Sequence, residues 1–176
     1  ALTRLENFQF PISFNETTKT YLEFTTSKLT NETSKQLRQL LDDGENYKYP
    51  TLISESPDLN AQLRTTCVAT RLSGGHANNA LPVAATATVN CRVLPHENPK
   101  DIMSIIKNIV GNDVEVGMVW VPESSPPSPV TSQILNLIAN SLKNVFPSVA
   151  IVPYMSTGAT DAQALRNIGI PVYGTS

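Results

Sequence analysis

The sequence predicts an α+β protein: a ferredoxin-like unit lacking its first strand, followed by a fragment of a parallel α/β sheet. Residues 64–121 show the patterns of two strands, a helix and another strand, and one strand in front would complete a ferredoxin-like sheet. Residues 131–176 alternate helix and strand, which is typical of parallel α/β sheets. A proline-rich stretch at 122–130 marks a stiff linker. We therefore expect one domain over 1–122, a linker over 123–130 and a partial second domain over 131–176.

The first sixty residues are predicted to be largely helical. Apolar residues recur at helical spacing over 1–8, 17–29 and 31–44. Residues 45–60 contain two prolines and are expected to form a long surface connection. The stretch at about 13–60 is therefore interpreted as a helical insertion in the first domain.

Two strands are predicted at 64–72 and 84–94, joined by a loop rich in Gly, Asn and Pro. In the second strand, small or apolar residues alternate with polar ones. The apolar set is Ala85, Ala87, Val89, Cys91 and Val93, and the polar set is Thr86, Thr88, Asn90 and Arg92. This alternation is typical of antiparallel strands with one face in water.

A helix and a strand are predicted to complete the first domain. Asn98 provides a cap, Pro99 suits the first helical position, and Gly111 ends the helix. The Val-rich run at 114–121 is expected to be the next strand.

The second domain is predicted to begin with a helix that Thr131 or Ser132 caps and Pro147 stops. Its apolar residues are expected to face inward: Ile134, Leu135, Ile138, Leu142, Val145 and Phe146. A buried strand is predicted at 149–153, followed by a short helix and a last strand at 170–174.

Composition argues against two classes of partner. The 176 residues are 40% hydrophobic and carry a net charge of −2, which gives no electrostatic basis for binding nucleic acid or an anionic membrane. No apolar run approaches the ~20 residues that span a bilayer. No secretory leader is visible, and we expect a fragment or a processed product of a longer protein. The compartment is not indicated.

The two cysteines and two sequons leave alternatives open. Cys67 and Cys91 lie in consecutive predicted strands, so either a disulfide or two buried thiols fits, and we favour buried thiols. Asn15 and Asn31 stand in Asn-x-Thr sequons, a pattern that also arises by chance.

The loop at 73–82 and the strand after it carry two candidate residues. His76 can donate a proton or stabilise an oxyanion, although an exposed loop histidine is the more common outcome. Arg92 has the fork geometry that binds a carboxylate, although an arginine on a wet sheet face is often only solvated.

The turn at 156–161 follows a predicted strand, which is where ligands bind in parallel α/β sheets. Gly158 permits close approach of a ligand to the backbone, Thr160 adds a hydroxyl, and Asp161 suits a helix N-terminus. A plain capped turn explains the same residues, with Thr160 or Asp161 as cap and Gly158 chosen for its dihedral angles.

No metal site is predicted in this chain. A catalytic zinc needs about three protein ligands. The only histidines, His76 and His96, lie in different loops, and no His-x-Asp or Cys-x-x-Cys motif occurs. Taken alone, the chain shows no complete active site.

Two motifs together resemble the zinc-dependent metallopeptidases that include aminoacylase, carboxypeptidase S and succinyl-diaminopimelate desuccinylase. The lid, or dimerisation, domain of that family has a Gly-Gly-x-x-x-Asn-x-[Ile/Val]-Pro loop, read here at 74–82, and a strand ending in Arg-x-x-Pro, read here at 92–95. The family's catalytic domain has a Gly-x-Thr-Asp segment and a later Gly-Ile-Pro, read here at 158–161 and 169–171. The carboxypeptidase S-like branch is the one that the sequence resembles most.

The resemblance implies an α/β zinc-hydrolase that cleaves a peptide or an N-acyl amino acid amide. Two zinc ions would activate water, and a Glu would act as the general base. The family's metal-binding motifs are not in this sequence, so this chain alone is expected to be inactive.

The resemblance also implies roles for residues of this chain and a homodimer. Asn79 and Arg92 would bind the substrate from the lid. Gly158, Thr160 and Asp161 would line the pocket from the catalytic domain. His76 is the catalytic candidate only because its loop lies near that of the family's lid histidine, whose own segment is not in this sequence.

A different class of function fits the same sequence. A non-catalytic dimerisation module would pair the edges of a ferredoxin-like sheet in two copies. A small-molecule regulatory domain of similar topology is a third interpretation, against which the α/β segment after Val130 argues. A His-x-Asp motif and a Glu pair upstream in the full reading frame would favour the enzyme.

Overall fold

The computed structural model describes residues 1–44, 47, 50–120 and 124–175. Two compact units are present, each built from two stretches of the chain. The sheet unit comprises Ala1–Phe10 and Arg64–Ser124, and the helical unit comprises Pro11–Leu63 and Ser125–Ser176. Residues 45–46, 48–49 and 121–123, which belong to the predicted connection, strand end and linker, lie outside the described residues.

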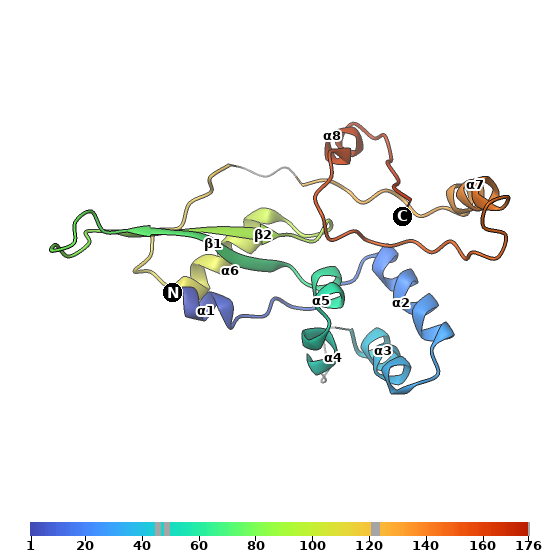
Figure 1. The fold of residues 1–176 in the computed structure, drawn as a ribbon, viewed down its shortest axis with the longest axis horizontal. Coiled ribbons are helices and arrows are strands. Elements are labelled where there is room, and N and C mark those ends of the chain that lie inside the picture. Colours follow the sequence, from blue (N-terminus) through green and yellow to red (C-terminus); the bar gives the residue numbers. More distant parts are fainter. Residues whose placement is uncertain (45–46, 48–49, 121–123, 176) are drawn as a thin grey trace. The chain divides into compact units, whose positions relative to one another are not determined.

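The sheet unit is an antiparallel hairpin with two helices (Figure 1). β1 (Thr66–Gly74) pairs with β2 (Ala85–Arg92), and α1 (Leu2–Glu6) contacts both β1 and α6 (Pro99–Val110). The small core of the unit contains Leu5, Phe10, Leu94, Ile102 and Val110. The two predicted strands and the predicted helix are confirmed, and the mixture of helices with a small antiparallel sheet agrees with the predicted α+β class.

Local signals explain the placement of α6. The side chain of Asn98 accepts a hydrogen bond from the backbone N–H of Lys100, and Pro99 occupies the first turn as predicted. Gly111 follows the helix at φ 88°, a backbone angle that favours glycine.

A bulge at Thr70 preserves the alternation of faces along the hairpin. Ala69 lies opposite Val89, but the next pair is Arg71 with Thr88, so Thr70 is an extra residue in β1. Arg71 therefore shares the polar face with Thr88. Leu72, which lies opposite Ala87, returns to the apolar face.

The two cysteines form a disulfide, so the preference for buried thiols was wrong. Cys67 and Cys91 lie directly opposite each other, with their Cα atoms 4.1 Å apart. Both side chains are half-buried. Direct cross-strand pairing brought the sulfur atoms together, and the sequence alone did not fix that register.

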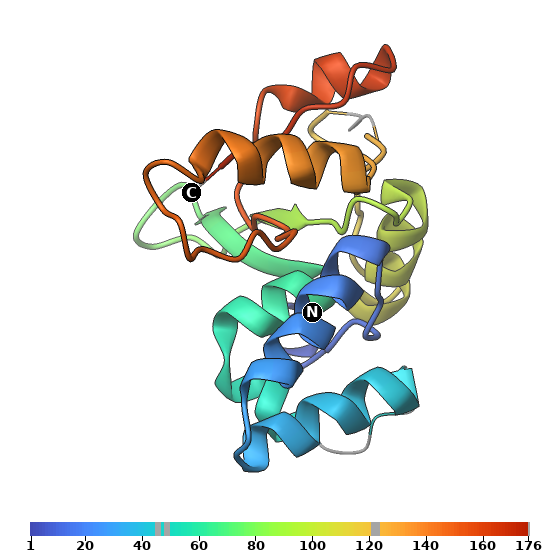
Figure 2. The ribbon, with the colours of Figure 1, turned by 90° about the vertical axis from the view of Figure 1, so that its right-hand side faces the viewer.

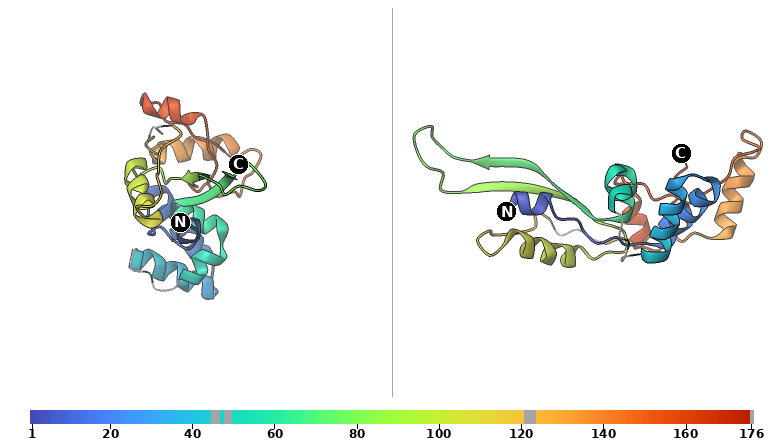
Figure 3. Two further views of the ribbon diagram at one scale, coloured as in Figure 1. Left: turned by 90° about the vertical axis from the view of Figure 1, so that its left-hand side faces the viewer. Right: turned by 90° about the horizontal axis from the view of Figure 1, so that it is seen from below.

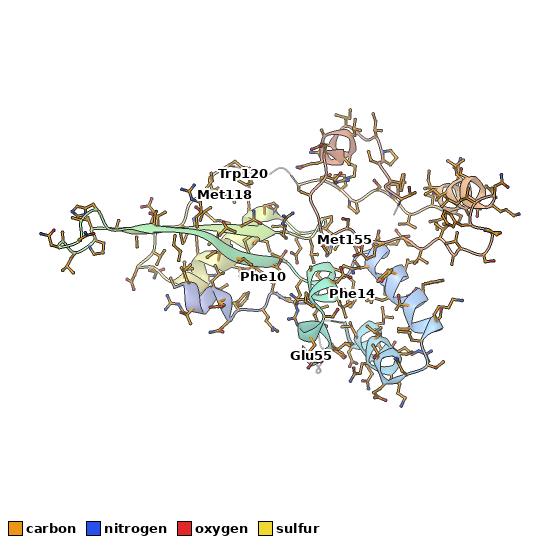
Figure 4. All side chains as sticks on the ribbon, in the orientation of Figure 1. Phe10, Phe14, Glu55, Met118, Trp120 and Met155 are labelled. Atoms are coloured by element: carbon orange, nitrogen blue, oxygen red, sulfur yellow. A yellow bond between two sulfur atoms is a disulfide. The ribbon has the colours of Figure 1, made fainter. Side chains whose placement is uncertain are left out.

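The predicted strand at 114–121 is not formed over its described residues, 114–120. Strands need a hydrogen-bonded neighbour, and this segment pairs with no strand in the described part of the chain. Its apolar side chains are left in solvent, with Val119 82% and Trp120 69% exposed (Figure 4).

The first part of the helical unit, Pro11–Leu63, contains four helices among its described residues. These are α2 (Glu16–Lys28), α3 (Glu32–Asp43), α4 (Pro50–Glu55) and α5 (Pro57–Leu63). α2 and α3 pack against each other across a short turn (Figure 2). The buried core is Ile12, Leu22, Leu37, Leu40, Tyr47, Ile53 and Leu63.

The prediction of a long surface connection over 45–60 was wrong for most of its described residues. Pro50 and Pro57 each begin a helix, α4 and α5, because proline tolerates the first turn where no N–H is needed. Both prolines therefore start helices and do not mark a loop.

The remainder of the helical unit contains α7 (Ser132–Leu142) and α8 (Ala162–Asn167). Thr131 caps α7 by accepting from the N–H of Ile134, as predicted. The helix buries none of its residues, and Val145 and Phe146 lie beyond its end and are 68% and 56% exposed. The predicted inward face is thus only partly covered: Ile134, Leu135, Ile138 and Leu142 are half-buried, whereas the prediction was wrong for Val145 and Phe146.

The strands predicted at 149–153 and 170–174 are absent. The segment at 170–174 is instead held by hydrogen bonds to the proline-rich segment. The hydroxyl of Ser128 donates to the carbonyl of Val172 at 2.7 Å and accepts from its N–H at 2.9 Å. Tyr173 donates its hydroxyl to the carbonyl of Pro129 at 2.6 Å. The proline-rich segment thus packs on the end of the chain within the helical unit.

Candidate functional site

The polar face of the hairpin is the first candidate surface. Thr86, Thr88, Asn90 and Arg92 are exposed along β2, whereas the alternate residues Ala87, Val89 and Cys91 are half-buried. Arg92 lies opposite Thr66, at the start of β1. Among the described residues Arg92 makes no ion pair, so its guanidinium is open to a ligand.

The tip of the hairpin is the second candidate surface. His76 and Asn79 lie in the loop between the strands, and both are exposed. The tip extends past α1 and α6 (Figure 3). Leu81 and Val83 in the same loop are 91% and 92% exposed, so the tip combines polar groups with uncovered apolar ones.

Two glycines shape the entry to this tip loop. A Cβ at Gly74 would lie 3.3 Å from the Cα of Ala85, which is too close for an easy fit. Gly75 has φ 75°, which disfavours other residues. The glycine pair is therefore explained by the turn itself.

Asn79 and Arg92 lie at opposite ends of β2. The eight residues of β2 separate the tip loop from Arg92, a span of about 23 Å at about 3.3 Å per residue. One hairpin therefore cannot bring both side chains to one small ligand. The thirteen-residue spacing between Asn79 and Arg92, most of it along one strand, already indicates this separation in the sequence.

The turn at 156–161 belongs to the helical unit. The Ser156 hydroxyl accepts from the N–H of Gly158 at 3.3 Å, and the Thr160 hydroxyl accepts from the N–H of Ala162 at 3.3 Å. Asp161 precedes α8 but makes no capping hydrogen bond. Gly158, Thr160 and Asp161 are all exposed.

Gly158 is required neither by backbone angle nor by packing. Its φ is not positive, in contrast to Gly169 at φ 82°, and a Cβ would meet only the Ser156 hydroxyl, at 3.7 Å. The interpretation of Gly158 as a residue chosen for its dihedral angles is therefore wrong.

No group of three or more His, Cys, Asp or Glu side chains within the described ranges is arranged to hold a metal ion. Nor does any helix among those residues have the length and apolar character needed to cross a bilayer.

Comparison with known families identifies the chain. A family model described as peptidase dimerisation domain matches residues 3–118. The chain belongs to this family. The predicted relationship to metallopeptidases is thereby confirmed, and β1, β2, α6 and the tip loop all lie within the dimerisation domain.

Three relatives show what kind of protein carries this dimerisation domain. N-fatty-acyl-amino acid synthase/hydrolase of Homo sapiens is 31% identical over 98% of this chain, which covers 35% of that enzyme. The Mus musculus enzyme of the same name is 32% identical over 69% of this chain and 25% of its own length. Probable carboxypeptidase S-like 2 of Dictyostelium discoideum is 30% identical over 66% of this chain and 23% of its own length. The chain thus spans about a third or less of these curated relatives, and no solved structure matches it significantly.

The structure brings only some of the predicted site residues near one another. His76 and Asn79 share the tip loop, and Gly158, Thr160 and Asp161 share one turn. Arg92 lies apart from Asn79 on the same hairpin. The dimerisation-domain residues and the 156–161 turn belong to different units, each of which is compact in itself.

Proposed function

We propose that the full-length protein is a zinc-dependent metallopeptidase or amidohydrolase that cleaves a peptide or an N-acyl amino acid. The observation that carries this proposal is the match of residues 3–118 to the peptidase dimerisation domain. The names of the relatives, which describe N-fatty-acyl-amino acid hydrolysis and a carboxypeptidase, support the substrate class. This chain supplies the dimerisation domain and part of the catalytic domain.

Arg92 binds the substrate carboxylate in this proposal. Both substrate classes carry a free carboxylate next to the scissile amide. An exposed guanidinium with no ion pair among the described residues, on a polar sheet face, suits such a group as a two-pronged donor.

In this proposal Asn79 binds the substrate that lies in the active site of the partner protomer. Because β2 separates it from Arg92 by about 23 Å, the two side chains can serve one ligand only if they come from different protomers. In a homodimer with two-fold symmetry, each active site would take Arg92 from one copy and Asn79 from the other. His76 would accompany Asn79, since both lie in the tip loop.

The 156–161 turn lines the pocket from the catalytic side. Gly158 has no structural need to be glycine in this chain, which supports a role in close approach of the substrate to the backbone. The Asp161 carboxylate is not used as a cap, so it is available to orient a group of the substrate or of the metal site.

The apolar run at 114–120 is a strand of the ferredoxin-like sheet in the full-length protein. Its exposed Val119 and Trp120 are what an unpaired inner strand would show. In the same proposal α7 packs its partly covered apolar face on the sheet of the complete catalytic domain.

The described residues do not fit a zinc site, because none of their His, Cys, Asp and Glu side chains cluster in threes. We therefore assign the metal ligands to the rest of the full-length protein.

The test is hydrolysis by the purified full-length protein. Two substrate series should be offered, N-fatty-acyl amino acids and dipeptides, before and after chelation and after return of zinc. We expect one series to be cleaved, activity to vanish on chelation and zinc to restore it. A protein that dimerises but cleaves neither series would instead be the non-catalytic dimerisation module.

A further inference from the structure

We propose that Asn31 carries an N-linked glycan in the mature protein and that the second sequon, at Asn15, stays unmodified. Both asparagines stand in Asn-Glu-Thr sequons, and both cap a helix from extended backbone, with ψ of −177° at Asn31 and 174° at Asn15. The two sites differ in what surrounds the side-chain nitrogen, Nδ2.

At Asn31 the amide oxygen and nitrogen have separate roles. Oδ1 accepts from the backbone N–H of Ser34 at 3.2 Å and so caps α3. Within the described ranges no acceptor takes a hydrogen bond from Nδ2. A sugar on Nδ2 therefore leaves the cap intact.

The surroundings of Asn31 leave room for a large polar group. Lys28, Thr30, Asn31 and Glu32 are all exposed around the turn between α2 and α3. A buried hydrogen bond joins the two helices below this turn: the Ser34 hydroxyl donates to the carbonyl of Thr26 at 3.1 Å. The exposed turn therefore leaves the Asn31 side-chain nitrogen open to solvent.

At Asn15 both side-chain atoms are already used. Oδ1 accepts from the N–H of Thr18 at 2.8 Å, and Nδ2 donates to the Met155 sulfur at 3.7 Å. Asn15 is half-buried. Tyr154, the residue before Met155, packs its ring edge-on against the ring of Tyr21 in α2, with the ring centroids 5.2 Å apart. A glycan on Nδ2 would occupy the space where residues 154 and 155 lie.

The disulfide is the independent observation that places the chain where glycosylation occurs. Cys67 and Cys91 are joined. Structural disulfides persist in the secretory pathway and outside the cell and are rare in reducing compartments. N-linked transfer takes place in the same oxidising compartment.

The modification step balances with one co-substrate, an oligosaccharide linked to a lipid through a diphosphate. A bond forms between Nδ2 of Asn31 and C1 of the first sugar, and the bond between C1 and the diphosphate oxygen breaks. The amide nitrogen loses one proton, and the lipid diphosphate leaves.

The test is site-by-site occupancy in the full-length protein secreted from eukaryotic cells. Enzymatic release of N-glycans in heavy-oxygen water converts each modified Asn to a labelled Asp, which peptide mass spectrometry locates. We expect the label at Asn31 and not at Asn15. The mobility shift on release should become smaller by one glycan in Asn31→Gln and Thr33→Ala and stay unchanged in Asn15→Gln and Thr33→Ser.

Thr33→Ser keeps the sequon, whereas Thr33→Ala removes it but keeps the Asn31 side chain that caps α3. Similar secreted yields of the two variants would show that Thr33→Ala still folds, so a missing glycan would then reflect loss of the sequon. An unlabelled Asn31 in the secreted protein, or a shift of unchanged size in both Asn31→Gln and Thr33→Ala, overturns the proposal. Label at Asn15 overturns its second half.

Discussion

The hydroxyl of Tyr154 donates a 2.8 Å hydrogen bond to Oδ1 of Asp58, ninety-six residues earlier in the chain. The other oxygen of Asp58 accepts from Gln62 Nε2 at 2.8 Å, so this carboxylate joins α5 to the extended segment near residue 154. The Tyr154 ring also meets Tyr21 of α2. These contacts anchor the closing part of the chain to the four-helix core of the helical unit.

Tyr154→Phe should lower the free energy of unfolding by about 1 kcal/mol, because it removes one hydrogen bond to a charged acceptor at a partly exposed site. Tyr21→Phe is the matched control, since it keeps the ring contact and no hydrogen bond of the Tyr21 hydroxyl occurs among the described residues. Chemical denaturation measures both. If both variants lost the same free energy of unfolding, the hydrogen bond of the Tyr154 hydroxyl would contribute nothing to stability.

Stability should also fall in alkaline solution through Tyr154. Burial, followed by the hydrogen bond to Asp58 and its negative charge, raises the pKa of Tyr154 to about 12 from its ordinary value of 10.0. A raised pKa means that the folded protein holds this proton more tightly than the unfolded chain. The contribution is therefore complete below pH 10 and is lost as the pH rises to about 12.

The size of this alkaline loss will be less than the full shift implies, because the Tyr154 side chain is 46% exposed and water screens the charge. Unfolding curves at several pH values between about 9 and about 12 should decline less steeply for Tyr154→Phe than for the original protein. Identical slopes would contradict the shifted pKa. Asp58→Asn should bring the pKa of Tyr154 down, as NMR titration of its ring would report.

Removal of the disulfide should destabilise the protein by about 3 kcal/mol, because the bond closes a loop between residues 24 apart. Cys67→Ser with Cys91→Ser is the variant, and unfolding with and without a thiol reductant is the measurement. Reductant should weaken the original protein and leave the double variant unchanged. If the original protein reacted fully with a thiol reagent before any reductant was added, the disulfide would be refuted.

Arg92→Ala should lower kcat/KM of the full-length enzyme roughly ten- to a hundredfold, because a charge-assisted hydrogen-bond pair to the substrate carboxylate is lost. Arg71→Ala is the matched control, since Arg71 is exposed on the same polar face but nearer the tip. It should leave kcat/KM nearly unchanged. Arg92→Lys should recover only part of the loss, because a single ammonium cannot form a two-pronged contact.

Local signals in the sequence predicted local structure well. The caps at Asn98 and Thr131 and the end of α6 at Gly111 depend on a few neighbouring residues, and each lies where expected. The alternation along β2 likewise follows from the hairpin itself.

The features that differ from the sequence-based expectations depend on residues far away in the chain. A Val-rich run such as 114–120 becomes a strand only when it pairs with another strand, and among the described residues no strand pairs with it. The Cys67–Cys91 bond required the register of the hairpin, which the bulge at Thr70 complicates. Pro50 and Pro57 are compatible with both a loop and a helix start, and the helical reading is favoured only by the core against which Ile53 and Leu63 pack.

The central claim is that each active site combines Arg92 of one protomer with Asn79 of its partner. Two full-length variants, Asn79→Ala and Arg92→Ala, should each be weakly active as pure homodimers. When the two are co-expressed, random pairing makes half of the dimers mixed, and each mixed dimer contains one intact site and one doubly altered site. The account predicts recovery to about a quarter of the original activity. Activity no higher than that of the weak single variants, in a preparation shown by tags to contain mixed dimers, would contradict it.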